Sequence, residues 1–444
     1  MLLNSGILNS VWTVVYYNNW HVMPVLSRLI MDHLNNFFNG AFYFFLFLAV
    51  LASLVYLFMG LAVVLTKEEG IEEKEFDEKK APFVTIQIPT RNEIIAIRCA
   101  KKCLQFDYPK DKYNILIGDD SNDESVSKRL AAFAKHHKNI QVIKREENIG
   151  YKPGNLNNML KHTKGEIIVV FDSDFIPEKD FLRRIITPFI HDKKVAAVQG
   201  RWKFINANKN FVTALASGIV YTCHNVALSL LSRRGMGFLC GSAEAVRKKD
   251  LIELGGWKNG CLTEDIEYSL RLHKNGKKIV YLPKLECYNE APSRPIDLYK
   301  QQMRWGHGVI SAYKTHATGL ITTSNLNPEK KLLSMVSCWG YVLPILFIIL
   351  FLTGSLSFIT HRPEAMDLGK FAFESLRNIA FTSGWLICSF VALYRAKKAR
   401  LMLRMMLSSF SFGLVTVYYV NIGIIKAIAN KPMNWYLLKK SQRV

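Results

Sequence analysis

Cysteine patterns that build metal sites are missing from this chain. Its eight cysteines are scattered through 444 residues, and none are spaced as Cys-x-x-Cys or as a Cys/His zinc motif. This absence excludes a cysteine-based zinc site and favours reduced cytosolic thiols. The first residues also lack a basic start and a small-residue cleavage site, so no cleavable signal peptide is expected.

Acidic side chains are scarce relative to basic ones. The chain has 36 Asp and Glu against 58 Lys and Arg, which gives a formal net charge of +22 and a pI of about 9.6. Such a surplus indicates an anionic partner, which is a membrane surface, a nucleic acid or a small substrate such as a nucleotide sugar. The basic residues are spread along the chain and partly flank apolar runs. Binding to nucleic acid is therefore not expected.

Charge is absent altogether from residues 41–66, an apolar run of 26 positions. A run of this length can cross the hydrocarbon core of a bilayer, and a buried soluble helix is rarely apolar on all sides for so long. Similar stretches follow at 333–360, 376–394 and 401–428, although the last contains Arg404. We therefore expect a multi-pass integral membrane protein in contact with the lipid bilayer.

The chain is expected to alternate between membrane and soluble parts. The predicted boundaries are 1–39 for an interfacial segment, 40–66 for a transmembrane helix, 67–81 for a charged linker, 82–296 for the soluble domain, 297–330 for amphipathic interface helices, 331–430 for about three transmembrane helices and 431–444 for a basic tail. The basic loop RAKKAR at 395–400 indicates the cytosolic side. If the soluble domain is also cytosolic, three simple C-terminal spans place the basic tail outside, and this conflict stays open.

Short apolar runs alternate with polar, helical stretches in the soluble domain. The predicted strands are 84–90, 114–120, 140–144, 166–172 and 195–200. This alternation predicts a parallel-type sheet covered by helices on both faces. Such sheets bind ligands at the carboxyl ends of their strands, where Thr90, Asp120 and Asp172 fall.

Two pairs of carboxylates follow predicted strands. Asp119 and Asp120 can accept hydrogen bonds from a base or a ribose, although the same residues also suit a capped turn. Asp172 and Asp174 point the same way if the chain is extended there. Such a pair can share Mg²⁺ or Mn²⁺, which keeps waters and takes diphosphate oxygens as further ligands. A solvated turn is the alternative.

Two helix starts carry further candidates. Lys152 lies in a glycine-containing turn before a helix expected to begin near Leu156, where a phosphate can bind. Thr263 is the expected N-cap of a second helix, with Glu264 and Asp265 in its first turn. The helix dipole alone favours acidic residues in the first turn of a helix. The functional alternative is a general base that takes the proton of an attacking hydroxyl.

The stretch KQQMRWGHG lies between the soluble domain and the apolar tail. An amphipathic helix over 297–313, lying flat on the membrane, places Gln301 one turn before Trp305, with Arg304 beside them. An interfacial belt is one explanation. A functional alternative is that Arg304 meets a diphosphate through its planar fork while Trp305 offers a flat surface to a sugar. His307 receives no role.

Together these motifs resemble the membrane-bound family-2 glycosyltransferases of the cellulose synthase, cellulose synthase-like and hyaluronan synthase type. The likeness covers about residues 82–310. It rests on Asp119–Asp120, Lys-x-Gly at 152–154, Asp-x-Asp at 172–174, an acceptor-site-like segment at 238–257, Thr-Glu-Asp at 263–265 and Gln-x-x-Arg-Trp at 301–305. It implies an α/β GT-A fold, with a Rossmann-like nucleotide-sugar-binding domain inserted between transmembrane helices, and an inverting mechanism.

The resemblance also implies roles for individual residues. Thr90, Glu93, Asp119, Asp120, Lys152, Asp172, Gln301 and Arg304 would bind the nucleotide sugar; Asp172 and Asp174 would hold Mg²⁺ or Mn²⁺; Asp265, with Glu264, would be the catalytic base; Cys240, Gly241, Ser242 and Trp305 would contact the acceptor. Pro153 and Asn155 depart from the small residues common there. The tail is similar to the family's gating loop but lacks its usual Val-Thr, and the likeness favours a cytosolic tail.

The expected function is a processive polysaccharide synthase in the plasma membrane, with its catalytic domain in the cytosol. It would extend a β-linked chain and pass it through its own spans. UDP-glucose is the expected donor, because RWGHG and YLPKLECYNEAP look like the cellulose synthase-like branch. GDP-mannose and UDP-N-acetylglucosamine are alternative donors. A single-addition transferase acting on a lipid, similar to ceramide glucosyltransferases, and a transporter with a sensor domain are alternative functions.

Overall fold

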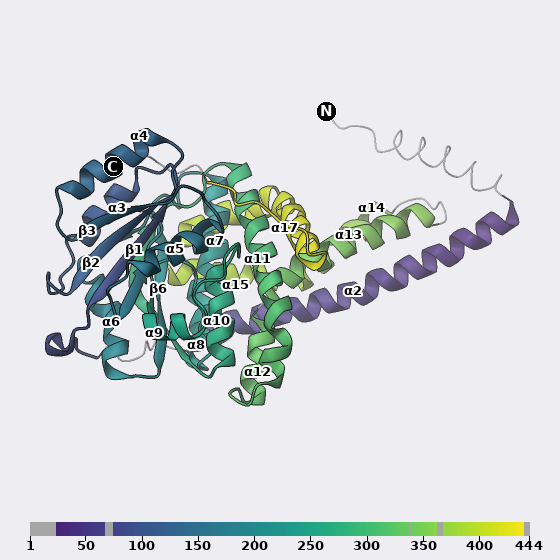
Figure 1. Cartoon of the computed structure of the whole chain (residues 1–444). Coiled ribbons are helices and arrows are strands. Elements are labelled where there is room, and N and C mark those ends of the chain that lie inside the picture. Colours follow the sequence, from purple (N-terminus) through teal and green to yellow (C-terminus); the bar gives the residue numbers. More distant parts are fainter. Residues whose placement is uncertain (1–23, 67–73, 338, 362–366, 439–444) are drawn as a thin grey trace. The chain divides into compact units, whose positions relative to one another are not determined.

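The computed structural model describes residues 24–66, 74–337, 339–361 and 367–438 (Figure 1). Predictions that fall on the other residues, including most of the interfacial segment and the end of the basic tail, lie outside the described residues. The chain divides into two compact units. One comprises residues 1–58 and 342–387, and the other comprises residues 59–341 and 388–444.

The larger unit is built on one mixed sheet of eight described strands. They are β1 (Val84–Thr90), β2 (Tyr113–Asp119), β3 (Ile140–Lys144), β4 (Ile167–Val170), β5 (Ile176–Pro177), β6 (Val195–Phe204), β7 (Glu244–Arg247) and β8 (Lys278–Asn289). Their order in the sheet is β3-β2-β1-β4-β7-β6-β8-β5. β7 runs antiparallel to β4 and β6, and β5 runs antiparallel to β8. The expectation of a parallel-type sheet is therefore corrected to a mixed one.

The register brings several strand ends to one edge of the sheet. β1 is buried along its whole length, as expected for a strand covered on both faces. Thr90 at its end pairs with Asp119 at the end of β2. The antiparallel β7 begins where β4 ends, because Glu244 pairs with Val170. The segment that precedes β7 is thus delivered to the same edge as the carboxyl ends of β1, β2 and β4.

Helices cover both faces of the sheet. Those of the larger unit's first part are α3 (Ala96–Cys103), α4 (Glu124–Lys135), α5 (Tyr151–Lys161), α6 (Phe181–His191), α7 (Phe211–Thr222), α8 (Leu228–Arg233), α9 (Lys248–Glu253) and α10 (Glu264–Lys274), with a 3₁₀ turn at Glu78–Lys80 and a π-helical turn at Cys223–Ala227. Leu156 of α5, Leu251 of α9 and Tyr268 of α10 share one buried apolar cluster with the strands. On α6, the ring of Phe181 lies 5.2 Å from that of Phe171, which follows β4.

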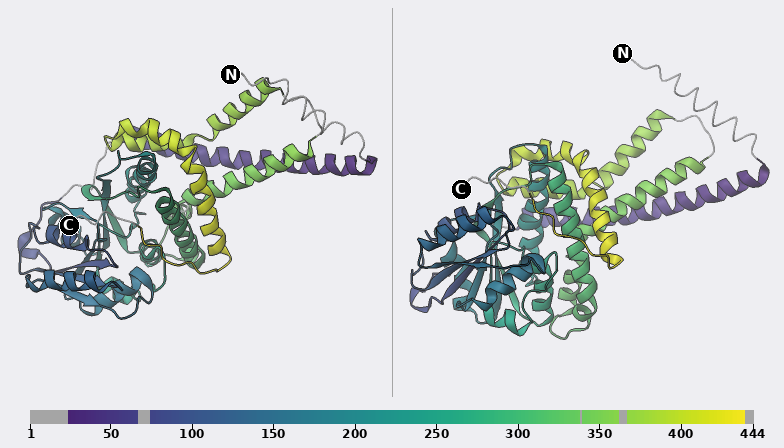
Figure 2. Two further views of the ribbon diagram at one scale, coloured as in Figure 1. Left: turned by 90° about the horizontal axis from the view of Figure 1, so that it is seen from above. Right: turned by 45° about the horizontal axis from the view of Figure 1, so that its top comes forward.

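α11 (Pro295–Thr322) packs along α17 (Phe412–Ile428) in the same unit, as Figures 1 and 2 show. Glycines permit this close approach. A Cβ atom at Gly423 would lie 2.2 Å from the carbonyl oxygen of Met303. α11 is therefore held inside the fold, with its residues Leu298, Val309 and Tyr313 buried. Its predicted position at a membrane surface stays a prediction.

The remaining helices are apolar or short. They are α2 (Val25–Leu65), α12 (Pro328–Val336), α13 (Val342–Thr360), α14 (Leu368–Phe381), α15 (Gly384–Arg395) and α16 (Met402–Ser409), with 3₁₀ turns at Trp339–Tyr341 and Ala399–Leu401. In the smaller unit, Asn35 of α2 donates a hydrogen bond to the carbonyl of Ser357 (2.7 Å), and the amide of Gly384 donates to the hydroxyl of Ser53 (2.8 Å). The described residues 25–39 fall in the segment predicted to be interfacial, and they form the first part of helix α2.

Three described helices are long and apolar enough to cross a membrane, and up to five spans result if each bent pair counts as one. The stretch predicted at 376–394 falls on α14 and α15, which are bent by 51°, and that at 401–428 falls on a pair bent by 66°. The stretch at 333–360 is divided between α12 and α13. Phe211–Arg233 also qualifies, although 78% of its most apolar stretch is buried. It is not among the spans predicted from the sequence.

Candidate active site

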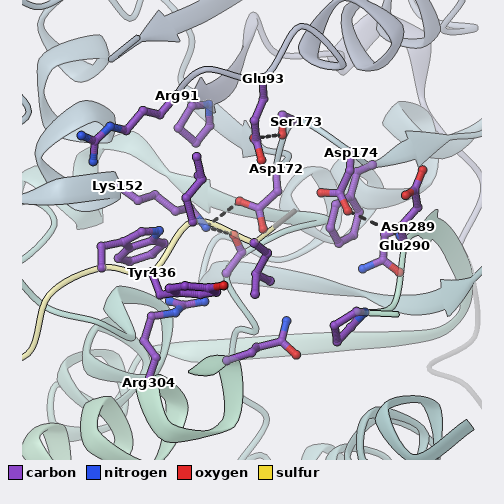
Figure 3. Close-up of a pocket in the computed structure, with 18 of the residues that line it drawn as sticks. Arg91, Glu93, Lys152, Asp172, Ser173, Asp174, Asn289, Glu290, Arg304 and Tyr436 are labelled. Carbon is purple, nitrogen blue, oxygen red and sulfur yellow. Dashed lines mark hydrogen bonds and ion pairs between the residues drawn. The ribbon is translucent and has the colours of Figure 1, made fainter. Parts of the chain in front are cut away.

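A cavity of about 650 Å³ opens at the edge where β1, β2 and β4 end (Figure 3). It is lined by most of the residues that the sequence motifs select, namely Thr90, Glu93, Asp120, Lys152, Asp172, Asp174, Cys240, Gly241, Glu264, Asp265, Gln301, Arg304 and Trp305. The fold thus brings together side chains separated by more than 200 positions in the chain. Asp119 and Ser242, also selected from the sequence, lie behind this lining.

The two carboxylates after β2 have different surroundings. Asp119 is fully buried, and its side chain accepts hydrogen bonds from the amide of Ser121 (2.9 Å) and the hydroxyl of Ser127 (2.5 Å). This arrangement matches the capped turn that the sequence left as an alternative. Asp120 faces the cavity and accepts two hydrogen bonds from the guanidinium of Arg145, one of them 2.7 Å long. Burial raises the pKa of Asp120, and Arg145 opposes that rise.

Lys152 lies at the centre of the charged residues. Its ammonium is 2.9 Å from a carboxylate oxygen of Asp172 and 2.9 Å from one of Glu264, and it also donates to the carbonyl of Gly241. Burial alone lowers the pKa of Lys152, but the negative charges around it outweigh burial and raise that pKa. Helix α5 begins at Tyr151 rather than near Leu156 as predicted, because Gly150, with a φ of +77°, turns the chain into the helix one turn earlier.

The Asp-x-Asp segment forms a turn after β4, not the extended chain that was predicted. The side chain of Asp172 therefore reaches Lys152, while Asp174 lies beside Asn289 and Glu290 (Figure 3). The amide of Glu290 donates a hydrogen bond to the Asp174 carboxylate (3.4 Å). Arg98 donates to the carbonyl of Asp174 (3.3 Å) and pairs with Glu290, which ties the turn to the end of β8.

The oxygens around this turn suit a hard divalent cation. Asp172 and Asp174 offer carboxylates, and the Asn289 side chain lines the same cavity. The side-chain oxygen of Asn289 is buried and has no hydrogen-bond partner among the described residues. No group of three or more His, Cys, Asp or Glu in the described residues is arranged to hold a metal ion. The donor set therefore fits Mg²⁺ or Mn²⁺ that takes several ligands from a diphosphate and water.

The first turn of α10 places two carboxylates in the cavity wall. Thr263 occupies the predicted N-cap position, but its side chain makes no capping hydrogen bond. Glu264 and Asp265 are both buried. Burial, followed by the negative charge of Glu264, raises the pKa of Asp265 to about 7, and Lys152 opposes this rise. A carboxylate with such a pKa can take and release a proton near neutral pH.

α11 supplies the Gln-x-x-Arg-Trp residues to the opposite wall. Arg304 donates a hydrogen bond to the carbonyl of Leu262 (2.9 Å), and its guanidinium lies 4.0 Å from the ring centre of Trp435. Gln301 and Trp305 line the cavity on either side of it. Arg304 is thereby fixed in the wall of the cavity that Asp172 and Asp174 also line.

The segment before β7 completes the floor. Cys240 and Gly241 line the cavity, whereas Ser242 is buried and its hydroxyl accepts a hydrogen bond from the amide of Asp172 (2.9 Å). Ser242 therefore holds the Asp-x-Asp turn in place. Glu244, the first residue of β7, accepts a hydrogen bond from the amide of Gly241 (2.8 Å). Glu244 belongs to none of the motifs recognised in the sequence.

The described part of the basic tail crosses the cavity. Trp435, Tyr436, Leu437 and Leu438 all line it. The hydroxyl of Tyr436 donates to the carboxylate of Asp297 on α11 (3.0 Å), and a ring nitrogen of His307 lies 3.1 Å from the carbonyl of Lys431. His307, left without a role by the sequence, thus contacts the start of this segment.

The chain has relatives among known transferases. The chain is 29% identical over 349 residues to glucomannan 4-beta-mannosyltransferase 2 of Arabidopsis thaliana. The aligned region covers 74% of this chain and 62% of the relative. It is 33% identical over 239 residues to a beta-monoglucosyldiacylglycerol synthase of Nostoc sp., covering 52% and 50% of the two chains. The chain spans about half to three-fifths of the length of the curated relatives it matches.

The fold has a counterpart among solved structures. A mannosyltransferase from Pyrobaculum calidifontis, solved in complex with GDP-Man and Mn²⁺, superposes with a TM-score of 0.58 at 17% sequence identity. The match covers 90% of this chain and 99% of the other. This likeness confirms the GT-A fold that the sequence motifs predicted. Residues 81–308, which carry every strand and nearly every cavity residue described above, match the family described as "Glycosyltransferase like family 2", and the chain is therefore a family-2 glycosyltransferase.

Proposed function

We propose that the protein transfers mannose from GDP-mannose to a growing glycan and forms a β-linkage with inversion. The names of its relatives support mannose, so the expected donor UDP-glucose gives way to GDP-mannose. The observation that carries the proposal is the meeting of Lys152, Asp172 and Asp265 in one cavity with Arg304.

The proposed nucleotide end of the cavity lies at β1 and β2. Asp120, held in one orientation by Arg145, accepts hydrogen bonds from the base and the ribose. Thr90 and Glu93 contribute the neighbouring wall. Asp119 supports the turn from behind rather than touching the nucleotide.

The diphosphate is proposed to lie between Lys152 and Arg304. Both cations are in the cavity wall, and Gln301 adds a neutral hydrogen-bonding group. Asp172, Asp174 and Asn289 would hold Mg²⁺ or Mn²⁺, which supplies positive charge to the leaving diphosphate. Arg304 is positioned for this contact by Leu262 and Trp435, so little side-chain freedom is lost when a diphosphate binds.

The transfer step needs one group that accepts the proton of the attacking hydroxyl. A hydroxyl of the acceptor forms a bond to C1 of the sugar while the bond between C1 and the phosphate oxygen breaks. Asp265 takes the hydroxyl proton, and GDP leaves with the electron pair of the broken bond. Glu264 holds Lys152 beside the base. Trp305 stacks on the acceptor sugar, and Cys240 and Gly241 form the floor beneath it.

A lipid acceptor that receives a single sugar is the second candidate. It is favoured by the similarity to the beta-monoglucosyldiacylglycerol synthase of Nostoc sp.. In either case we propose an integral membrane protein, with its catalytic domain cytosolic and the plasma membrane as its site. In the processive case the product passes through the apolar helices, and the tail at 431–438 gates the cavity.

The test uses the full chain purified in detergent with Mg²⁺ or Mn²⁺. Labelled GDP-mannose, UDP-glucose and UDP-N-acetylglucosamine are supplied separately, and the product is sized and its linkage determined. We expect a β-mannose ladder from GDP-mannose. One sugar per lipid would support the second candidate. Transfer only from UDP-glucose or UDP-N-acetylglucosamine, or transfer from no donor, would overturn the proposed function.

A further inference from the structure

Residues 240–243 form a turn with an uncommon backbone shape. Gly241 has a φ of +86° and Ala243 a φ of +52°, which lie in the left-handed region that L side chains avoid. The turn packs tightly against the reacting groups. A Cβ atom at Gly241 would lie 3.2 Å from the Asp265 carboxylate and 3.4 Å from the Lys152 ammonium. Gly241 therefore lies directly against both of these side chains.

Buried side chains hold this turn from behind. Glu244 accepts a hydrogen bond from the amide of Gly241 (2.8 Å). Gln199 on β6 accepts one from the amide of Cys240 (2.7 Å) and donates to the carbonyl of Ser242 (3.0 Å). Gln199 is fully buried and Glu244 is 1% exposed. The amides of Cys240 and Gly241 would each lose a buried partner if Gln199 or Glu244, respectively, were truncated.

Glu244 lies close to two other carboxylates, those of Asp265 and Glu264. Burial, followed by the negative charge of Asp265, raises the pKa of Glu244 well above its ordinary value, although Lys152 opposes the rise. The carboxyl accepts the Gly241 hydrogen bond through an oxygen atom in either protonation state. The acceptor oxygen, rather than a charge, is thus the feature of Glu244 that the turn uses.

We propose that Glu244 is a positioning residue for the sugar acceptor, acting through the Gly241 peptide on the wall beside Asp265. The inference rests on the proposed function. It predicts that loss of the Glu244 oxygen misplaces the acceptor hydroxyl relative to Asp265. The nucleotide end of the cavity lies on β1 and β2 and is not held by this contact.

The test compares Glu244→Leu with Glu244→Gln. Leucine has a similar volume but no oxygen, whereas glutamine keeps one. We expect Glu244→Leu to lower kcat by roughly 10-fold to 100-fold, as a small misplacement of reacting groups does. Its Kd for GDP with Mn²⁺ should match that of wild type in calorimetry. Glu244→Gln should restore kcat close to wild type.

Asp250→Asn is the matched control. Asp250 is also a buried acid, but it pairs with Lys277 and does not line the cavity. It should cost stability and leave kcat per folded protein unchanged. Wild-type kcat in folded Glu244→Leu, or equal losses in both Glu244 variants, would overturn the inference. Absence of transfer by the wild-type protein would instead overturn the proposed function on which it rests.

Discussion

At the scale of single residues, Lys152 connects three parts of the cavity. Its ammonium lies 2.9 Å from Asp172 after β4 and 2.9 Å from Glu264 on α10, and it also bonds the Gly241 carbonyl. The same charge opposes the rise in the pKa of Asp265. Lys152 therefore fixes the geometry of the site and also sets how readily the proposed base loses its proton.

The pKa of Asp265 predicts the acid limb of the pH–rate profile, which is the range in which kcat/KM falls as the pH is lowered. Burial and the charge of Glu264 raise this pKa to about 7. A general base works only when deprotonated, so kcat/KM should fall about 10-fold per pH unit below that value and level off above it. Initial rates between about pH 5.5 and pH 9 check this. Asp265→Asn should abolish transfer while GDP still binds, and a rate that stays constant through the acid range would contradict the role.

Replacing Lys152 should move that limb in a known direction. Lys152→Met removes a positive charge that lowers the pKa of Asp265, so that pKa rises and the limb shifts to higher pH. The variant should also bind GDP more weakly, which calorimetry measures. Lys161→Met, at the exposed end of the same helix, is the control and should change neither quantity. An unshifted limb in Lys152→Met would argue against the coupling.

The sequence selected the cavity residues that belong to local motifs, and it missed those whose meaning depends on a distant partner. Asp172 and Asp265 stand in short acidic patterns that follow a strand or start a helix. Arg145 has no such pattern, because its partner Asp120 is 25 positions away. Glu244 resembles any residue of a short strand, and its function follows only from the position of Gly241 in space.

At the scale of elements, apolar content as well as length decided which strands the sequence could predict. β1 and β3 have the predicted bounds. β4 and β7 are both four residues long, but β4 is apolar throughout and is predicted, whereas β7 begins with Glu244 and ends with Arg247. β5 is only two residues long. β8 contains Pro283 and shifts register with β6 between Gly200 and Arg201, which hides its regular pattern. Because β7 is so short and its sequence shows no strand pattern, its antiparallel direction could not be predicted.

The packing of α11 on α17 yields a prediction at this scale. A side chain at Gly423 meets the carbonyl of Met303 at 2.2 Å, one residue before Arg304. Gly423→Val should push the two helices apart, lower the free energy of unfolding by about 1–3 kcal/mol, and reduce transfer. Gly413→Ala in α17 is the control, because its added atom finds only an ordinary contact at 3.5 Å. Thermal unfolding and initial rates measure both. Equal behaviour of the two variants would show that α11 tolerates displacement.

At the scale of the whole molecule, the chain returns to its own cavity after more than 100 residues. The cavity is built by residues up to Trp305, and the segment 431–438 then crosses it after the last helix. The sequence suggested a gating loop there from its likeness to a known motif. It gave no sign that Trp435 would stack on Arg304, because an aromatic residue in a basic tail also suits a membrane interface.

This contact predicts how the tail affects the reaction. The ring of Trp435 lies 4.0 Å from the Arg304 guanidinium, and an interaction of this kind contributes about 0.5–2 kcal/mol. Trp435→Ala should loosen Arg304 and open the cavity to water, so that GDP-mannose is hydrolysed more often per sugar transferred. Trp435→Phe keeps a ring over Arg304 and should lie between the alanine variant and wild type. The measurement is GDP released with and without acceptor. An unchanged ratio in Trp435→Ala would mean that the Trp435 ring does not shield the donor from water.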